Sequence, residues 1–423
     1  MNRWGFLSPL TRRGHALLWS GVVVTVVSLL FGQRDFVRVG IFLAALPLIC
    51  LALMSRTKFR LSLTRSLAQN RIPVTGTTTS ALRLHNVSRM SSGLLLVEDA
   101  LPWELGRPQR LVVDQLGANQ WRDVTATLHG GARGRYTIGP ASLTFVDPFG
   151  LCRTTRRFTT TDTLTVVPTT VPLPAAPLQG DWSGVGDSRA RAIASHGDDD
   201  VIPREYRIGD DLRRVHWKST ARSGELMVRR EEQPWRNRVT VILDTRTGAH
   251  RGDGITSSFE WSVTAVASIG AHLLERGFGV RLLTIDGTPI VSTNTTSETF
   301  SGSDSVGGLL DALATVTNDA AADVAIINPE AFADGVIIAV LGDLSAPDAD
   351  RLSSLRRSRT LALALLLDTA SWTGRSQIPD DPSVTRASAV FTFSGWRPAI
   401  CGRETPLAQA WQSITVNPQV GVS

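Results

Sequence analysis

A chain of 423 residues has room for two or three domains, and a hydrophobic fraction of 42% fits a folded protein with some membrane content. The formal charge is +6, but residues 1–60 hold eight basic residues and one acidic residue, which leaves 36 basic and 37 acidic residues for the rest of the chain. Nucleic-acid binding needs a basic face on the binding domain itself, so this distribution argues against a nucleic-acid partner.

Two apolar runs near the start of the chain account for the position of the positive charge. They cover residues 16–32 and 39–54, and each is close to the lower limit of about 17 residues for a spanning helix, which flanking residues can extend. Pro47 lies inside the second run, where a membrane helix tolerates it. We therefore expect residues 1–58 to form a membrane anchor of two helices in a hairpin.

Basic residues on both sides of this hairpin predict its orientation. Arg12 and Arg13 precede the first run, and Arg56, Lys58 and Arg60 follow the second. The positive-inside rule then makes this a multi-pass cell-membrane protein, with both termini and the soluble domains in the cytoplasm. A cleaved signal peptide, with one apolar core and a small-residue cleavage site, fits less well, as do two buried core helices. Three widely spaced cysteines suit a reducing compartment.

Residues 59–172 read as an all-β, sandwich-like module. Short alternating runs are separated by Gly, Asn, Pro and Ser at intervals of roughly ten residues, a spacing typical of antiparallel sheets. The DPFGL segment at 147–151 predicts a tight turn with a structural role. Residues 173–197 are rich in Pro, Gly and Ser and predict a linker.

Residues 198–235 combine many arginines and carboxylates with aromatic residues and turn glycines in one short segment. Guanidinium groups hold carboxylates in bidentate geometry, so this mixture predicts a joint between two modules or a docking surface for a partner. The residues that we assign to this partner-binding or interdomain role are Arg204, Glu205, Tyr206, Gly209, Asp210, Asp211, Arg213, Arg214, His216, Trp217, Lys218, Arg222 and Glu225.

Residues 236–423 predict an α/β domain with a mostly parallel sheet. Apolar strands alternate with helices, and such sheets are covered on both faces. Four expected strands each end in an aspartate, namely Asp244, Asp286, Asp343 and Asp368. Because ligands bind beyond the carboxyl ends of such strands, this edge of the sheet is a candidate site, and carboxylate oxygens suit a hard cation.

Three ordered motifs resemble a bacterial family catalogued as "domain of unknown function" number fifty-eight. They read GRYTIGPASLTFVDPFGL at 134–151, REYRIGDDLRRVHWKSTARSGELMVRREE at 204–232 and VTVILDTR at 239–246. The resemblance covers most of the chain after about residue 60, and it concerns architecture more than chemistry.

The C-terminal α/β segment also resembles the von Willebrand factor A-type domain, whose metal site uses D-x-S-x-S after the first strand. Asp244 occupies the first position of that motif, but Arg246 and Gly248 stand where two hydroxyl ligands are expected. A cationic side chain at a ligand position disfavours a divalent ion, so we expect Arg246 to pair with Asp244 or Asp343 instead. The prediction is a degenerate site with no cofactor, and Mg²⁺ at Asp244 and Asp343 is the alternative.

The resemblance implies a membrane-anchored, cytoplasm-facing, non-enzymatic scaffold or adaptor. Its implied partner is a MoxR-type AAA+ ATPase, often beside membrane proteins with transglutaminase-like domains. One alternative is a Mg²⁺-dependent adhesion or binding module at Asp244 and Asp343.

A hydrolase is the remaining alternative. In it His216 acts as acid and base, since histidine is the natural proton carrier near neutral pH. Asp210 or Asp211 would orient His216, and Lys218 or Arg213 would stabilise charge. The segment has no G-x-S-x-G, phosphate-loop or HExxH motif beside it, which makes this the weaker hypothesis.

Overall fold

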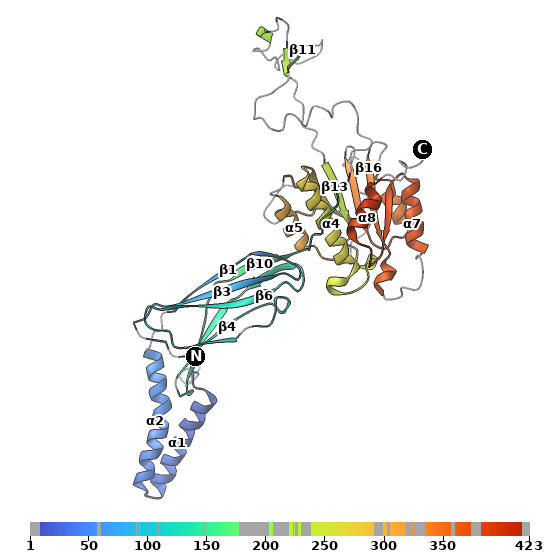
Figure 1. The fold of residues 1–423 in the computed structure, drawn as a ribbon. Coiled ribbons are helices and arrows are strands. Elements are labelled where there is room, and N and C mark those ends of the chain that lie inside the picture. The colour runs from blue at the N-terminus through green and yellow to red at the C-terminus, as the bar shows by residue number, and fades with distance from the viewer. Residues whose placement is uncertain are drawn as a thin grey trace. The chain divides into compact units, whose positions relative to one another are not determined.

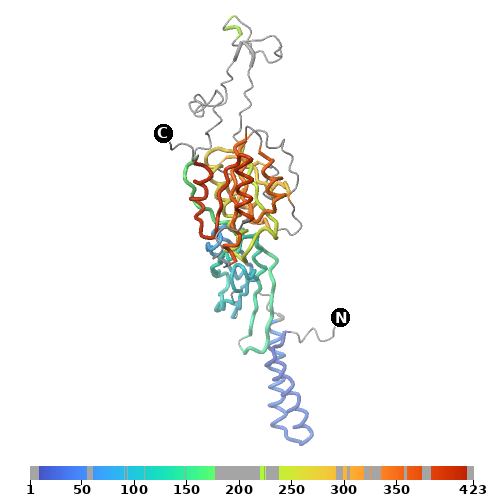
Figure 2. The backbone as a smooth tube through the Cα atoms, turned by 90° about the vertical axis from the view of Figure 1, so that its right-hand side faces the viewer, coloured from blue at the N-terminus to red at the C-terminus, as the bar shows by residue number. Residues whose placement is uncertain are grey.

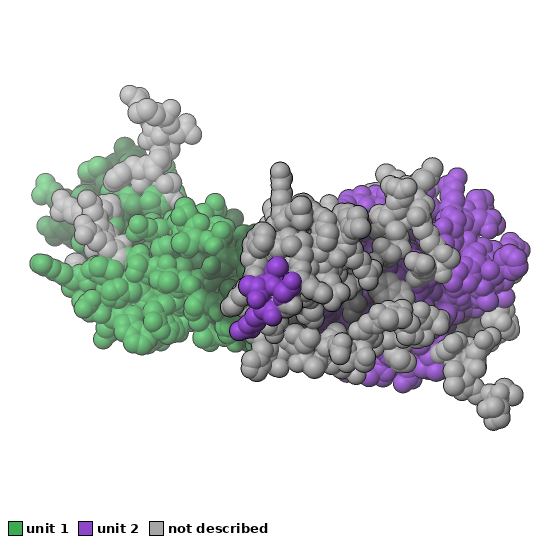
Figure 3. Space-filling model, turned by 90° about the horizontal axis from the view of Figure 1, so that it is seen from above, with its two compact units in different colours: residues 1–169, 253–256, 310–317 green, residues 170–252, 257–309, 318–423 purple. Residues whose placement is uncertain are grey.

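The computed structural model describes most of the chain (Figure 1). The described residues are 9–56, 61–89, 91–92, 94–108, 110–147, 149–176, 203–205, 220–222, 224, 227–229, 238–291, 299–302, 305–318, 324, 335–356, 360–373 and 382–416. They divide into two units, coloured in Figure 3. Unit 1 holds residues 1–169, 253–256 and 310–317, and unit 2 holds residues 170–252, 257–309 and 318–423.

Unit 1 begins with two antiparallel helices, α1 (Arg12–Leu30) and α2 (Arg34–Arg56), which lie side by side in both Figure 1 and Figure 2. Glycines let them approach closely: a Cβ at Gly21 would lie 2.5 Å from the Ala44 nitrogen, and one at Gly40 would lie 2.7 Å from the Thr25 nitrogen. Small residues at the contact are typical of membrane helix pairs. Both helices are long and apolar enough to cross a membrane, as the sequence predicts.

The remainder of unit 1 is β-rich, as expected for this part of the chain. Its strands form three sheets of order β1-β3-β6, β2-β10-β7 and β5-β4-β8-β9. The strands are β1 (Leu61–Leu67), β2 (Arg71–Pro73), β3 (Thr77–Asn86), β4 (Leu94–Asp99), β5 (Arg110–Val113), β6 (Trp121–His129), β7 (Gly134–Ile138), β8 (Ala141–Val146), β9 (Arg153–Arg157) and β10 (Asp162–Val167), with a short helix η2 (Trp103–Leu105).

Alternation of side chains explains how these short strands build a core. In β1 every second residue is buried, and its partner β3 alternates in the same way. Since successive side chains point to opposite faces, one face of each strand packs inward. Leu84, Leu95 and Leu143 meet in one core cluster, and Leu128 and Leu164 belong to a second.

The C-terminal part of unit 2 is a five-stranded parallel sheet flanked by helices, as predicted. Its strand order is β14-β13-β15-β16-β17, and every neighbouring pair is parallel. The elements are β13 (Arg238–Leu243), α4 (Ser258–Glu275), β14 (Gly279–Thr284), α5 (Val306–Ala314, whose second half clusters with unit 1), β15 (Val336–Leu341), α6 (Ala346–Ser353), β16 (Leu361–Leu367), α7 (Pro382–Phe393), β17 (Arg397–Cys401) and α8 (Leu407–Thr415).

Both faces of this sheet are buried, which accounts for its continuous apolar strands. Ile242 and Ala364 on one face pack with Leu352 of α6 and Phe391 of α7. The strand β17 and the helix α7 were not predicted from the sequence. β17 contains Pro398, its residues other than Cys401 are not buried, and it therefore lacks the apolar run that marks the other four strands.

Candidate functional site

The chain order of the parallel sheet defines one switch point. β13 lies between β14 and β15, so the chain leaves β13 toward one side and later returns on its other side. Ligands of open α/β sheets bind outside the carboxyl ends of the strands at such a point. Asp244 directly follows β13, and Asp343 follows β15 after Gly342, so both predicted carboxylates reach this position.

The Asp244 carboxylate is fully buried and is held by four hydrogen bonds. Its Oδ1 accepts the Arg246 Nε–H at 3.0 Å and the Arg246 backbone N–H at 3.1 Å. Its Oδ2 accepts an Arg246 Nη2–H at 2.8 Å and the Gly342 backbone N–H at 3.1 Å. The guanidinium thus grips the carboxylate with two parallel bonds, which is the strongest geometry for this pair.

The Arg246 guanidinium also reaches two further acceptors, both contributed by the next strand and helix. Nη2–H donates to the Asp343 backbone oxygen at 2.9 Å, and Nη1–H donates to Asp348 Oδ2 at 3.2 Å. Burial alone would lower the pKa of Arg246, but the hydrogen bonds and charge of Asp244, together with Asp348 and Asp343, outweigh burial and raise it. The pairing predicted for Arg246 is therefore confirmed.

Helix α6 supplies Asp348 through its own N-terminal cap. Ser345 caps the helix by accepting the Asp348 backbone N–H at 3.3 Å, and its hydroxyl donates to Asp348 Oδ2 at 2.6 Å. A Ser followed three residues later by an acidic residue is a common helix start. The link between Asp348 and Arg246 has no local sequence signal, because the two residues lie 102 positions apart.

A buried histidine supports the backbone of Asp244 from the other side. His250 Nε2 lies 2.9 Å from the Asp244 carbonyl oxygen and therefore carries the proton, while Nδ1 lies 3.1 Å from the Ser258 hydroxyl, which donates to it. The Ser258 oxygen in turn accepts the Arg251 backbone N–H at 2.9 Å. Burial lowers the pKa of His250, so the neutral ring is favoured. No sequence motif pointed to His250.

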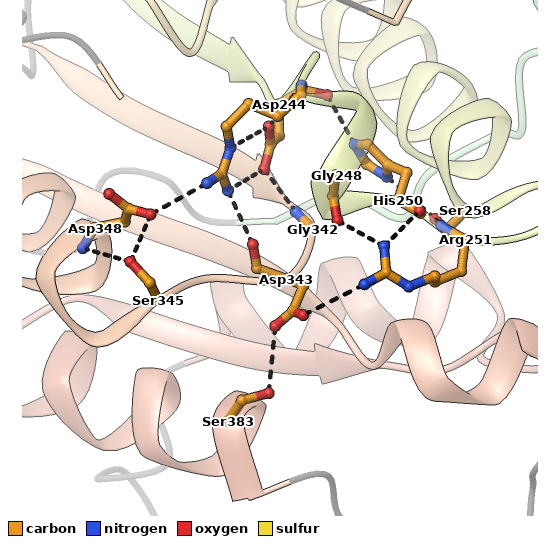
Figure 4. Close-up of polar contacts among 11 residues, drawn as sticks. Asp244, Gly248, His250, Arg251, Ser258, Gly342, Asp343, Ser345, Asp348 and Ser383 are labelled. Carbon is orange, nitrogen blue, oxygen red and sulfur yellow. Dashed lines mark hydrogen bonds and ion pairs between the residues drawn. The ribbon is translucent and has the colours of Figure 1, made fainter. Parts of the chain in front are cut away.

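Figure 4 shows these groups converging from β13, β15, α6 and α7. The Asp343 carboxylate accepts the Ser383 hydroxyl at 3.3 Å and lies 4.0 Å from the Arg251 guanidinium. The Asp343 backbone N–H donates to the Ala249 carbonyl at 2.9 Å. Gly342 permits this approach, because a Cβ there would collide with the same carbonyl oxygen. Asp343 remains 35% exposed and is the accessible carboxylate of the network.

The other two strand-end aspartates do not join this network. Asp286 is exposed and is bound within its own turn, where it accepts the Thr288 N–H at 3.0 Å and pairs with the Thr284 hydroxyl. Burial would raise the pKa of Asp286, but these hydrogen bonds outweigh it and lower the pKa. In Asp368, Oδ1 is buried and lacks a hydrogen-bond partner among the residues that the structure describes.

This geometry does not suit a divalent ion at Asp244. The two oxygens that would bind the ion are both hydrogen-bonded to a guanidinium, and a cation beside them would repel a second one. Within the described ranges, no three His, Cys, Asp or Glu side chains gather closely enough to hold a metal. The negative charges of Asp244 and Asp348 are instead neutralised by Arg246 of the same chain.

Most of the charged segment at 198–235 lies outside the described residues. Its described parts include β11 (Pro203–Glu205) and β12 (Met227–Arg229), which pair antiparallel with Arg204 opposite Val228. Arg222, which is also described, is exposed. Outside the description fall Tyr206, Gly209, Asp210, Asp211, Arg213, Arg214, His216, Trp217, Lys218 and Glu225.

A family model covers this segment and the beginning of the sheet domain. Residues 203–319 match the family described as "Protein of unknown function DUF58". The match confirms the resemblance drawn from the sequence motifs at 204–232 and 239–246. No curated protein matches the chain.

Several solved structures resemble parts of the chain weakly. The CARDB domain of the PF1109 protein from Pyrococcus furiosus is 14% identical, with 26% of this chain and 97% of that chain covered and a TM-score of 0.19. The putative ApaA protein from Bordetella pertussis is 11% identical, with coverages of 26% and 97% and a TM-score of 0.20. The C-terminal domain of wzt is 9% identical, with coverages of 27% and 81% and a TM-score of 0.20. Likenesses of this size support no statement about function.

Proposed function

We propose that this protein is a membrane-anchored, cytoplasm-facing and non-enzymatic adaptor that works with a MoxR-type AAA+ ATPase. Its C-terminal domain would be of the von Willebrand factor A type with a degenerate metal site. The Arg246 guanidinium seated on Asp244 is the observation that carries this proposal. An A-type domain that recognises ligands through a metal needs a free carboxylate at this position, and here the carboxylate is occupied by a side chain of its own chain.

The internal ion pairs suit a docking surface better than a reaction centre. Asp244 and Arg246 link four separate elements by hydrogen bonds, namely β13, β15, α6 and the turn at 247–250. Fixed charge pairs position neighbouring parts and give register and specificity to a partner. The family match at 203–319 adds the charged segment, which we assign to partner docking. A transglutaminase-like membrane protein is the second partner that the family resemblance implies.

In-cell crosslinking followed by affinity purification and mass spectrometry tests the partner directly. The native protein should recover an AAA+ ATPase, and Arg204→Ala/Lys218→Ala should lose it. The matched control is Arg107→Ala/Arg110→Ala, two exposed arginines of the β-rich region, which should retain the ATPase. If the native protein recovers no ATPase while it still fractionates with membranes, the adaptor proposal fails.

Calorimetry with Mg²⁺ separates this proposal from a metal-dependent binding module. The native protein should show no specific heat of binding, because Arg246 already neutralises Asp244. Arg246→Ser, which frees the carboxylate and supplies a hydroxyl, should bind more tightly than the native protein. Binding of Mg²⁺ by the native protein that disappears in Asp244→Ala would instead establish the metal-dependent module.

A further inference from the structure

The turn between β8 and β9 packs against the two hairpin helices, all within unit 1. Leu151 and Cys152 form a buried cluster with Leu10, Cys50 and Leu51, and partly buried residues of both helices complete it. Leu10 pairs with Cys152 in an isolated bridge, and Cys152 Sγ–H donates to the Pro47 carbonyl at 3.8 Å. The turn at 147–152, in which Pro148 lies outside the description, is therefore attached to the helices through Leu151 and Cys152.

The contacts between this turn and the helices lie far from the loop that connects α1 and α2. Leu151 packs at Gly14, which precedes the last residue of α1, Leu30, by 16 positions, or roughly 24 Å at about 1.5 Å per residue. Pro47 follows the first residue of α2 by 13 positions, or roughly 20 Å. A hydrocarbon core about 30 Å thick that begins at the loop between the helices therefore extends past both contacts. A hairpin that spans the membrane brings this turn into the membrane boundary.

Polar groups of the turn are hydrogen-bonded within the protein, as a position at the membrane boundary requires. Asp147 Oδ1 accepts the Cys152 N–H at 2.6 Å, Asp147 Oδ2 accepts the Phe149 N–H at 3.2 Å, and the Asp147 carbonyl accepts the Gly150 N–H at 3.0 Å. Thr11 donates its hydroxyl to the Gly150 carbonyl at 2.7 Å and its N–H to the Leu151 carbonyl at 2.8 Å. Backbone groups that leave water need such internal partners.

The outer side of the turn combines an apolar tip with basic residues. Phe149 is 63% exposed, although Asp147 and Leu151 are buried and Gly150 is half-buried. Arg12 and Arg13 start α1, Arg153 starts β9, and all three are exposed. The Arg153 backbone lies beside the residues that precede α1, because its N–H donates to the Pro9 carbonyl at 2.6 Å. An exposed aromatic side chain and exposed arginines in segments that are hydrogen-bonded to one another suit the boundary between acyl chains and phosphates.

We propose that this turn is a third membrane contact, in which Phe149 enters the interface and Arg12, Arg13 and Arg153 bind the phosphates of anionic phospholipids. The inference rests on the proposed membrane anchor and adds to it a lipid site on the β-rich region. The turn then orients the first strands relative to the membrane surface. Its ligand is an anionic phospholipid surface, recognised through charge and through the exposed ring.

Depth measurement by electron spin resonance tests this proposal on the full chain in nanodiscs of phosphatidylcholine and phosphatidylglycerol. A nitroxide is attached at Phe149→Cys, at Val26→Cys in α1 and at Trp103→Cys in η2, positions that are 63%, 52% and 83% exposed. The native cysteines are buried, and labelled unsubstituted protein measures their background. Trp103 is the control, because η2 packs beside Leu128 and Ile72, away from the strand ends that adjoin the hairpin.

The ratio of collision rates with oxygen and with a water-soluble nickel chelate reports depth. At position 149 this ratio should approach that at 26 and exceed that at 103 several-fold. A ratio at 149 equal to that at 103, with position 26 in lipid, overturns the proposal and leaves the anchor standing. If position 26 is also in water, the anchor itself fails, and this inference fails with it.

Charge reversal tests the phosphate contact separately. With the label at 149, Arg153→Glu should move it toward water in nanodiscs that contain phosphatidylglycerol and have little effect in phosphatidylcholine alone. Arg107→Glu, an exposed arginine near Trp103, is the matched control and should have no effect in either lipid. Equal ratios for the two variants in both lipids would overturn the assignment of anionic phospholipid as the ligand.

Discussion

Arg246 connects two carboxylates and a backbone oxygen that come from different elements, and only 14% of its side chain is exposed. A guanidinium in this setting is both the counter-charge of Asp244 and its main hydrogen-bond donor. Removing one member of a buried pair costs far more than replacing both, because the remaining charge stays in a medium that solvates it poorly. The stability of the C-terminal sheet domain should therefore depend on this single side chain.

Arg246→Ala should lower the free energy of unfolding by about 3 kcal/mol, since it leaves Asp244 buried and uncompensated. Denaturant unfolding measures the change. Arg246→Lys keeps the positive charge but not the planar guanidinium group, so its free energy of unfolding should fall by less than that of Arg246→Ala. The double variant Asp244→Asn/Arg246→Met should lose clearly less than the sum of its two single variants. Additive losses would show that the two side chains act independently.

His250 should make the stability of unit 2 depend on pH. Burial lowers its pKa in the folded state below the value of about 6.5 in the unfolded chain, so the unfolded chain binds the proton more readily. The stability that neutral His250 contributes is complete above pH 6.5. It is lost as the pH falls toward the lower pKa of His250 in the folded state. Thermal unfolding between pH 7 and pH 5 should show that slope.

His250→Gln should flatten the slope over the same pH interval. His129→Gln, at an exposed position of β6, is the control and should leave the slope unchanged. An identical slope in the native protein and in His250→Gln would assign the pH dependence to other groups.

At the scale of elements, the sequence predicted most of what surrounds the site. Buried parallel strands are continuous apolar runs, so four of the five strands and the aspartates that end them were visible. The pairing of Arg246 with Asp244 was visible as well, because a cation two residues beyond a strand-end carboxylate has it within reach. His250 and Asp348 were missed, since no local pattern says which distant side chain will meet β13.

The contact between α1 and α2 gives a prediction at the same scale. Gly21→Ile and Gly40→Ile should each force the helices apart, because a side chain at either position meets the backbone of the opposite helix. The change should appear as a lower thermal-unfolding midpoint of the full chain in detergent. Val26→Ile, at an exposed position of α1, should have no effect. Equal midpoints for all three variants would mean that the two helices do not pack closely.

For the whole molecule, the distribution of charge and apolar residues predicts an integral membrane protein with a nearly neutral remainder. The full chain should remain in the pellet when membranes are washed with alkaline carbonate, because two helices of this length and apolarity would insert essentially irreversibly. Val26→Arg/Ile41→Arg, which places a charge on an exposed position of each helix, should release a large fraction into the supernatant. Release of the native protein would contradict the anchor.

The guanidinium on Asp244 has one more consequence, which concerns how the protein responds to its surroundings. The occupancy of a metal-ion site depends on the concentration of the ion, and a chelator removes the ion. The Arg246 guanidinium, in contrast, is covalently part of the chain and cannot dissociate. Arg246 also keeps its proton at any physiological pH, and its pKa is raised further here. We therefore expect the edge of the sheet between β13 and β15 to keep the same charge whether magnesium or calcium in the cell is scarce or abundant. Excess EDTA should leave its unfolding temperature unchanged.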